Sequence, residues 1–173
     1  PSTVRVINRA STIRDWNEKL VSLRYPEWIP RTLVARDIQS IKGFAQTFPR
    51  VTIKPIDGHG GEGIVFAKAT DADFLEKVKL ATNNEGHWII VQQYLESANE
   101  GDKRILLLNG QPLGAILRLH KEGLELNNLD QGGTAVPSFL TDRDKAFIVG
   151  ADNQTIVEYA LQNYISDISK IDI

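Results

Sequence analysis

Lys54-Pro55-Ile56-Asp57-Gly58-His59-Gly60-Gly61-Glu62-Gly63 separates two short runs rich in β-branched residues, 51–53 and 64–67. Its four glycines leave the backbone free to adopt positive φ angles and to bring N–H groups close to a ligand. No Gly-Lys-Ser/Thr opens a helix here, which excludes a Walker loop, and a strand follows, which excludes the Rossmann fingerprint. The residues alone leave two interpretations open: a cover for phosphate groups, or a mobile hairpin tip.

Upstream of this loop, the spacing of apolar residues predicts two helices and a strand. Residues 16–23 predict a short helix stopped near Pro26. Residues 32–35 form an apolar run typical of a strand. Asp37 can cap a helix that ends before Pro49. The apolar face of that helix is Ile38, Ile41, Phe44 and Ala45.

Downstream of the loop, helix and strand signals alternate again. Residues 70–73 resemble a helix start with acidic residues in its first turn, and residues 87–94 return to strand character. The dipeptide Asn109-Gly110 lies between apolar runs, which predicts a hairpin of strands 104–108 and 111–118 joined by a tight type I′ turn.

Residues 119–140 are rich in glycine and asparagine and show no clear periodicity. This pattern predicts a long loop, and long loops in compact domains are usually functional or disordered. Thr141 with Asp142 and Asp144 then resembles another helix start.

Composition restricts the classes of function. A chain of 173 residues with 42% hydrophobic residues is long enough to bury a core. A net charge of −2 provides no field for a polyanion, so we expect neither nucleic acid nor membrane as a partner. The chain has no cysteine, which excludes disulfides and thiolate chemistry, and no run approaches the ~20 apolar residues of a membrane span. We expect a cytoplasmic location.

Several charged residues are candidates for binding a nucleotide. Lys54 precedes the glycine-rich loop and Lys19 lies far upstream, and two ammonium groups can neutralise a triphosphate. Asp102, Arg104 and Arg118 lie near the ends of the predicted hairpin strands, where side chains can project into a cleft. Solvated lysines and exposed ion pairs are the alternative explanation. The three histidines show neither metal spacing nor an acid partner, and we assign them no catalytic role.

Separated segments of the chain match one known family in the same order. They are Asn8-Arg9-Ala10, Asn17-Glu18-Lys19-Leu20, Pro30-Arg31-Thr32-Leu33, the glycine-rich segment 53–64, Val91-Gln92-Gln93-Tyr94-Leu95, Glu100-Gly101-Asp102-Lys103-Arg104, Leu117-Arg118-Leu119, Asn128-Leu129, Gly132-Gly133 and Leu140-Thr141. Over residues 4–145 the chain resembles prokaryotic glutathione synthetase, a member of the ATP-grasp superfamily. In-order agreement is more specific than any one motif.

The resemblance implies an α+β fold, a partial ATP-grasp fold with two small α/β lobes around a nucleotide cleft. It implies a single ATP-grasp-like region over residues 1–173. Within it, residues 1–50 are a lead-in segment, 51–95 are a small lobe with the glycine-rich loop, and 96–173 are a second lobe with a large loop and a tail.

The resemblance also implies roles for individual residues. Lys19 and Lys54 would contact the phosphates of ATP, with Gly60, Gly61 and Asn128 also in the nucleotide site. The adenine would be bordered by Gln93, Tyr94 and Leu95, and Asp102 would approach the ribose. Arg104 and Arg118 would face the phosphates and the acyl group as catalytic residues.

The family reaction needs Mg²⁺ with ATP. The carboxylate of γ-glutamylcysteine is phosphorylated, and the amine of glycine attacks the acyl phosphate; metals and arginines stabilise the charge. The implied partners are therefore a nucleotide and a small peptide or amino-acid substrate. A homo-oligomer, or a second chain that supplies a missing domain, stays open.

Three departures from the family bear on catalysis. The family has a further N-terminal domain ahead of the Asn-Arg-Ala segment. Its large loop reads Arg-Gly-Asn-Leu and carries another Arg after the double glycine, where this chain has Leu126-Asn127-Asn128-Leu129 and Thr134. Loss of even one preorganised donor typically costs on the order of a hundredfold in rate.

The third departure is the metal-binding tail, which has two interpretations. Residues 142–170 can be helical and end before the metal strands, which the clean periodicity from Ile156 onward favours. Alternatively, residues 148–152 and 156–158 are shortened strands that carry Asp152 and Glu158 as metal ligands, with Ala160 where the family has Asn.

These observations support an ATP-binding domain resembling glutathione synthetase, incomplete as a catalyst alone. A non-catalytic nucleotide-binding module for regulation or interaction is the alternative. A third hypothesis is an active ligase for a different carboxylate, with its metal sites rebuilt from Asp152 and Glu158.

Overall fold

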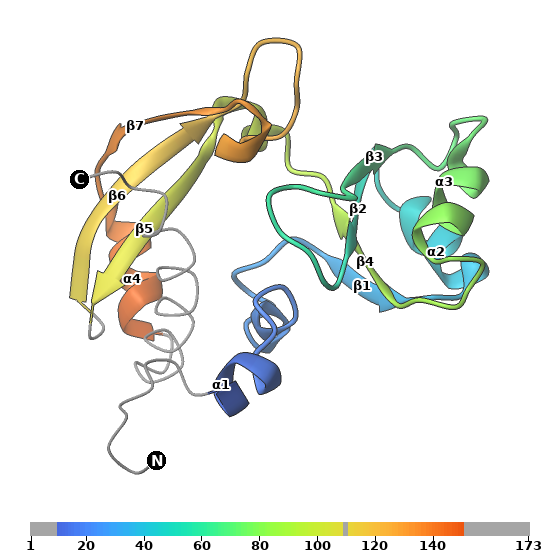
Figure 1. The fold of residues 1–173 in the computed structure, drawn as a ribbon, viewed down its shortest axis with the longest axis horizontal. Coiled ribbons are helices and arrows are strands. Elements are labelled where there is room, and N and C mark those ends of the chain that lie inside the picture. The colour runs from blue at the N-terminus through green and yellow to red at the C-terminus, as the bar shows by residue number, and fades with distance from the viewer. Residues whose placement is uncertain (1–9, 109–110, 151–173) are drawn as a thin grey trace. The chain divides into compact units, whose positions relative to one another are not determined.

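The computed structural model describes residues 10–108 and 111–150 and divides the chain into two compact units. The glycine-loop unit comprises residues 22–101 and 119–134. The hairpin unit comprises residues 1–21, 102–118 and 135–173. Each contains helix and antiparallel sheet, as the predicted α+β class requires (Figure 1).

The glycine-loop unit is built on a four-stranded antiparallel sheet with the order β1-β4-β2-β3. Its strands are β1 (Thr32–Ala35), β2 (Val51–Pro55), β3 (Val65–Ala67) and β4 (Ile89–Gln93). Ile53 lies opposite both Val65 and Val91, which places it at the centre of the sheet. All four predicted strands are confirmed.

Two helices cover one face of this sheet: α2 (Ile38–Ala45) and α3 (Phe74–Ala81) (Figure 1). The side chains of Ile41, Phe74 and Val78 are at most 1% exposed and pack with the buried strand residues in one core. Asp37 caps α2, as predicted: its Oδ1 accepts a hydrogen bond of 2.8 Å from the backbone N of Ser40. These helices hold the sheet that carries the glycine-rich loop.

The hairpin unit contains the predicted pair of strands, β5 (Asp102–Leu108) and β6 (Gln111–Leu119). The predicted type I′ turn at Asn109-Gly110 lies outside the described residues. A third strand, β7 (Thr134–Ser138), completes a sheet of order β5-β6-β7. Two helices belong to this part of the chain, α1 (Ala10–Asp15) and α4 (Asp142–Gly150).

The start of α4 confirms the predicted helix signal. Thr141 Oγ1 accepts from the backbone N of Asp144 at 3.1 Å, and Asp144 Oδ2 accepts from the backbone N of Thr141 at 2.7 Å. This reciprocal pair is a capping box. Residues 148–150 belong to α4, so the interpretation of residues 148–152 as a shortened strand is wrong for these three residues. The predicted metal ligands Asp152 and Glu158 lie outside the described residues.

The predicted helix at 16–23 is wrong for residues 16–20, which are not helical, and residues 21–23 lie in a 3₁₀ helix, η1 (Val21–Arg24), that ends before Pro26. An α-helix lies earlier, at Ala10–Asp15. Asn17 caps the turn that leads to η1: its Oδ1 accepts from the backbone N of Lys19 at 2.9 Å and of Leu20 at 3.1 Å, and its backbone O accepts from the N of Val21 at 2.9 Å. An N-cap residue lies outside helical geometry, so residues 16 and 17 are not part of a helix.

The predicted continuous loop over 119–140 is also wrong in part, because it contains β7 and a 3₁₀ turn, η3 (Leu129–Gln131). The strand is at the edge of its sheet, contains Pro137, and exposes four of its five residues. An exposed edge strand carries no alternation of apolar residues that could reveal it. Among the described helices, none has the length and apolar character needed to cross a bilayer.

Candidate functional site

The loop between β2 and β3 depends on its glycines. Gly58, Gly60, Gly61 and Gly63 all have positive φ angles, of 100°, 64°, 85° and 70°. The backbone N of Glu62 donates to His59 O at 3.1 Å, and that of Ile64 donates to Gly61 O at 3.3 Å. Residues with a Cβ rarely adopt these angles, so the loop requires glycine for its shape.

The glycine-rich loop packs against residues 126–131 of the same unit. A Cβ on Gly60 would lie 3.1 Å from Asp130 Oδ2, and one on Gly61 would lie 2.9 Å from Asn128 Oδ1 and 3.1 Å from Leu126 Cδ1. Gln131 Nε2 also donates to Gly60 O at 3.2 Å. An added Cβ at either position would push these side-chain ends aside, so glycine also favours the close approach of the two segments.

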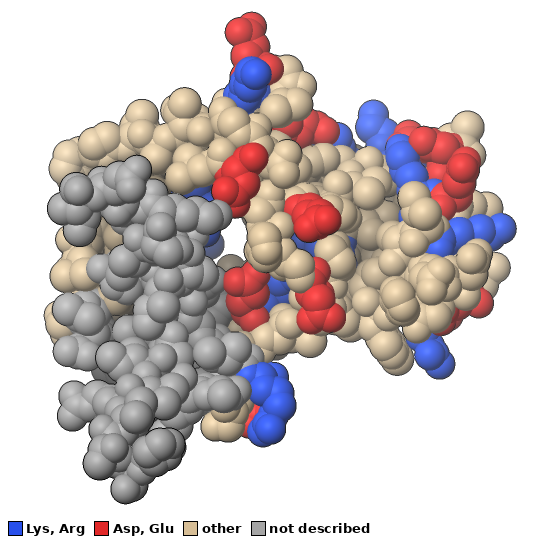
Figure 2. All heavy atoms as spheres, in the orientation of Figure 1, with Lys and Arg blue, Asp and Glu red and all other residues tan. Residues whose placement is uncertain are grey.

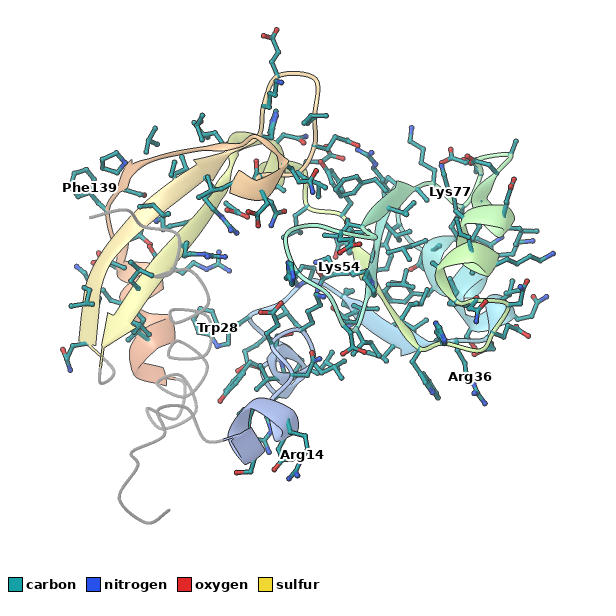
Figure 3. The ribbon with its side chains drawn as sticks, viewed as in Figure 1. Arg14, Trp28, Arg36, Lys54, Lys77 and Phe139 are labelled. Atoms are coloured by element: carbon teal, nitrogen blue, oxygen red, sulfur yellow. The ribbon has the colours of Figure 1, made fainter. Side chains whose placement is uncertain are left out.

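Lys54 lies near the end of β2, where the glycine-rich loop begins (Figure 3). Its Nζ donates to Gln92 Oε1 at 2.7 Å, and Gln92 Nε2 donates to Thr32 Oγ1 at 2.8 Å. The chain of bonds crosses from β2 through β4 to β1. A lysine ammonium is thus fixed beside the glycine-rich loop, where an anionic ligand would gain from its charge.

The predicted adenine border, Gln93 to Leu95, lies at the end of β4 and is followed by a 3₁₀ turn, η2 (Glu96–Glu100). The backbone N of Gln93 donates to Arg31 O at 2.9 Å, and that of Tyr94 donates to Arg50 O at 3.1 Å. Tyr94 is 8% exposed and its hydroxyl donates to Asn99 Oδ1 at 2.6 Å, whereas Leu95 is 44% exposed. The backbone of Gln93 and Tyr94 is thus hydrogen-bonded to neighbouring segments, and Leu95 presents an exposed apolar side chain.

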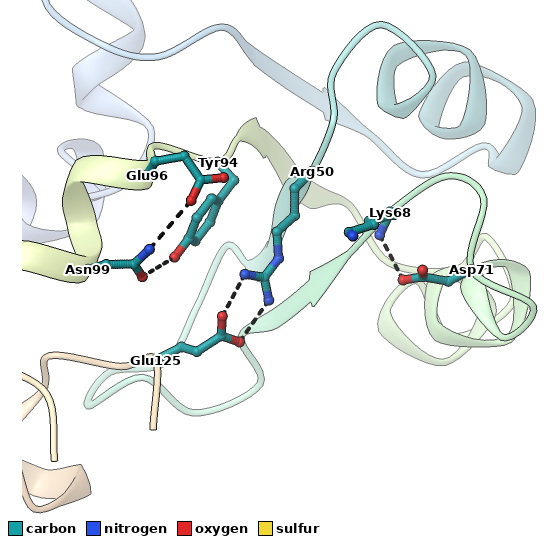
Figure 4. A network of polar contacts seen from close by, with 7 residues as sticks. All are labelled: Arg50, Lys68, Asp71, Tyr94, Glu96, Asn99 and Glu125. Carbon is teal, nitrogen blue, oxygen red and sulfur yellow. Dashed lines mark hydrogen bonds and ion pairs between the residues drawn. The ribbon is translucent and has the colours of Figure 1, made fainter. Parts of the chain in front are cut away.

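Tyr94 lies in a network of polar contacts that includes an ion pair the sequence did not reveal, Arg50–Glu125 (Figure 4). Arg50 donates from Nη1 to Glu125 Oε1 at 2.5 Å and from Nη2 to Oε2 at 2.7 Å. The hydrogen bonds to Arg50 hold the pKa of Glu125 below its usual value, and the same bonds raise the pKa of Arg50. The two residues are 75 positions apart, and no spacing rule links them.

In the hairpin unit, Asp102 and Arg118 are register partners across β5 and β6. Arg118 donates from Nε to Asp102 Oδ1 at 2.6 Å and from Nη2 to Oδ2 at 2.8 Å. Arg104 lies two residues along β5 from Asp102, so these three side chains share one face of the sheet. Two guanidinium groups on one face suit an anionic ligand.

The predicted site residues divide into two groups, one in each unit. Lys54, Gly60, Gly61, Asn128 and the segment 93–95 belong to the glycine-loop unit. The hairpin unit contains the remaining described members, Lys19, Asp102, Arg104 and Arg118.

The proposed metal ligands stay untested. Asp152 and Glu158 lie outside the described residues, and residues 10–108 and 111–150 contain no group of three or more His, Asp or Glu side chains placed to hold a metal ion. On the face shown in Figure 2, basic side chains of the described residues are interspersed with acidic ones rather than gathered into a patch. Basic side chains on this face are therefore placed individually.

Comparison with known sequences finds one family across most of the chain. The profile of the family described as prokaryotic glutathione synthetase, ATP-grasp domain, matches residues 18–158. The glutathione synthetase of Gloeobacter violaceus is 41% identical over 143 residues, 83% of this chain and 44% of that protein. That of Thermosynechococcus vestitus is 37% identical over 145 residues, 84% of this chain and 46% of that protein. The chain thus spans less than half the length of these relatives.

Comparison with solved structures finds the fold of ATP-grasp ligases. The D-cycloserine synthetase DcsG matches with a TM-score of 0.64 at 18% identity, covering 93% of this chain and 57% of that one. A RiPP-associated ATP-grasp ligase from Chryseobacterium gregarium, in complex with ADP and a leader and core peptide, gives 0.62 at 18% identity, covering 88% and 47%. At this identity the likeness concerns the fold alone, and it confirms the prediction of a partial ATP-grasp fold.

Proposed function

Because the chain belongs to the family of prokaryotic glutathione synthetase ATP-grasp domains, we propose that it binds ATP with Mg²⁺ as the nucleotide-binding part of a carboxylate-amine ligase. The observation that carries this proposal is the glycine-rich loop, with four positive φ angles and Lys54 fixed at its start. Backbone N–H groups and a neighbouring ammonium are the usual means of holding phosphate groups.

The glycine-loop unit would hold most of the nucleotide. Lys54 and the backbone at Gly60 and Gly61 would contact the phosphates, with Asn128 beside them. The segment 93–95 would border the adenine, a role supported by the backbone hydrogen bonds of Gln93 and Tyr94 and by the exposed apolar side chain of Leu95.

The hairpin unit, which includes Lys19, would supply charge for the phosphates and the reacting groups. Asp102 orients Arg118 through two hydrogen bonds, which use two of the five N–H donors that a guanidinium carries. We propose that Arg118 and Arg104 face the phosphates and the acyl group, and that Asp102 approaches the ribose. In this proposal the nucleotide phosphorylates the carboxylate of γ-glutamylcysteine, and the amine of glycine then displaces the phosphate.

Magnesium would neutralise the triphosphate charge when bound. The described residues do not form a cluster that fits a metal ion, so we derive no step through it. Asp152 and Glu158 stay predicted ligands. The cytoplasmic location also stays a prediction.

A second candidate function has a specific observation in its favour. Leu126 stands where the family has an arginine, and its Cδ1 lies in contact range of Gly61, so an apolar group faces the loop at that point. A site that lacks this charge can retain nucleotide and still fail to stabilise an acyl phosphate. The alternative is therefore a nucleotide-binding module without ligase activity.

Thermal unfolding with and without ATP and Mg²⁺ tests the binding proposal, since a ligand selective for the folded state raises the melting temperature. Lys54→Ala should abolish the rise, whereas Lys79→Ala removes an equal charge from the exposed end of α3 and should preserve it. An unchanged melting temperature at millimolar ATP would refute both candidate functions. ADP release with γ-glutamylcysteine and glycine then distinguishes the ligase from the binding module.

A further inference from the structure

The Arg50 side chain packs against two aromatic rings in addition to forming an ion pair. Its guanidinium lies over the Tyr94 ring (Figure 4), with the guanidinium carbon 4.6 Å from the ring centroid. The same carbon lies 5.1 Å from the centroid of the Phe66 ring. The two rings contact each other edge to face at 5.4 Å, and the backbone O of Arg50 accepts from the N of Tyr94. Arg50 is thereby tied to the residue at the centre of the proposed adenine border.

The fixed guanidinium holds Glu125 with two parallel hydrogen bonds. Exposed ion pairs usually contribute little, because both side chains lose freedom and water screens the charges. Here the Arg50 side chain is 25% exposed and already ordered by Phe66 and Tyr94, and the contact to Glu125 is bidentate. Such a pair is among the stronger ones.

Glu125 belongs to residues 119–134, which make two further sets of contacts within the glycine-loop unit. One set is to η2: Asn127 Nδ2 donates to Ala98 O at 2.8 Å, and His120 Nε2 lies 3.1 Å from Asn99 O. The other set is the packing of residues 126–131 against Gly60 and Gly61. Residues 119–134 therefore connect η2 to the glycine-rich loop, and the ion pair with Arg50 holds them at a third point, Glu125.

We propose that Arg50 is a positioning residue for nucleotide binding. Through Glu125 it fixes residues 119–134, and these in turn fix the glycine-rich loop at the distance from the adenine border that a nucleotide requires. This role rests on the proposed nucleotide binding. It adds that the affinity for the nucleotide depends on the Arg50–Glu125 ion pair, which acts through residues 119–134 and does not contact the nucleotide itself.

Three variants test this role. Glu125→Gln retains the size of the side chain and removes its charge, and Arg50→Lys retains the charge and removes the bidentate geometry. Lys77→Gln is the matched control, because it breaks the Lys77–Asp73 ion pair of α3 in the same unit, where the atoms lie 3.1 Å apart. The measurements are the Kd for ADP with Mg²⁺, by titration calorimetry, and amide hydrogen exchange of residues 119–134.

We expect Glu125→Gln to weaken ADP binding by about five- to tenfold and to accelerate exchange in residues 119–134 while leaving α2 unchanged. Arg50→Lys should give a smaller loss, and Lys77→Gln should bind as the parent chain does. Equal ADP affinity for Glu125→Gln and the parent overturns the inference alone. Absence of ADP binding by the parent chain refutes the proposed function and, with it, this role for Arg50.

Discussion

Gly61 and Asn128 approach so closely that a Cβ on the glycine would lie 2.9 Å from Oδ1 of the asparagine. Gly61 belongs to the glycine-rich loop, and Asn128 belongs to residues 126–131, which pack against that loop. Their contact makes position 61 a direct probe of how the loop is held, because a side chain there would collide with Asn128 and Leu126.

Gly61→Ala is expected to destabilise the protein by about 1–3 kcal/mol, because alanine is strained at a φ of 85° and its Cβ has no space. Gly43→Ala is the matched control: Gly43 lies in α2 with nothing within 4 Å of an added Cβ, so the change should stabilise the helix by roughly 0.5–1 kcal/mol. Urea unfolding measures both. A Gly61→Ala variant as stable as the parent chain would contradict the packing described here.

Asp144 should make the hairpin unit sensitive to acid. Its partial burial raises the pKa, but hydrogen bonds from Lys103 Nζ and from Thr141 outweigh this effect and hold the pKa below the usual Asp value. A carboxylate with a lowered pKa stabilises the fold at pH values above its unfolded pKa, about 3.9, and this contribution disappears as the pH falls through the folded value.

Asp144→Asn should therefore lower stability at neutral pH, and its difference from the parent chain should shrink as the pH falls below about 4. Asp142→Asn is the control, because Asp142 is fully exposed and bonds only weakly to Lys145 at 3.2 Å. Far-ultraviolet circular dichroism followed through acid titration measures the effect. A difference between Asp144→Asn and parent that does not vary with pH would rule out the carboxylate as its cause.

Features with a local physical signal could be predicted from the sequence. Asp37 ahead of an apolar helical face gave the start of α2, and the glycines of residues 54–63 gave a loop with positive φ angles between two strands. The strands on both sides of Asn109-Gly110 were equally clear. In each case the residues that determine the conformation lie within a few positions of it.

Features that depend on distant contacts could not be predicted. The strand order β1-β4-β2-β3 arises from pairing between segments far apart in the chain, and the Arg50–Glu125 pair joins residues with no common pattern. The glycines of the loop were evident in the sequence, but their packing partners, residues 126–131, were not.

Asp102 and Arg118 should behave as one unit in a double-mutant cycle. Asp102→Asn and Arg118→Gln are each expected to destabilise the hairpin unit by about 0.5–1 kcal/mol, since the pair is cross-strand, bidentate and only partly shielded from water. The double variant should cost about as much as either single one, because the first change already removes the interaction. Lys145→Gln, which breaks an exposed pair with Asp142, should have a negligible effect. Urea unfolding of the parent chain, the two single variants and the double variant gives the coupling energy. Strictly additive costs would show that Asp102 does not orient Arg118, and the proposed catalytic role of that arginine would lose its structural support.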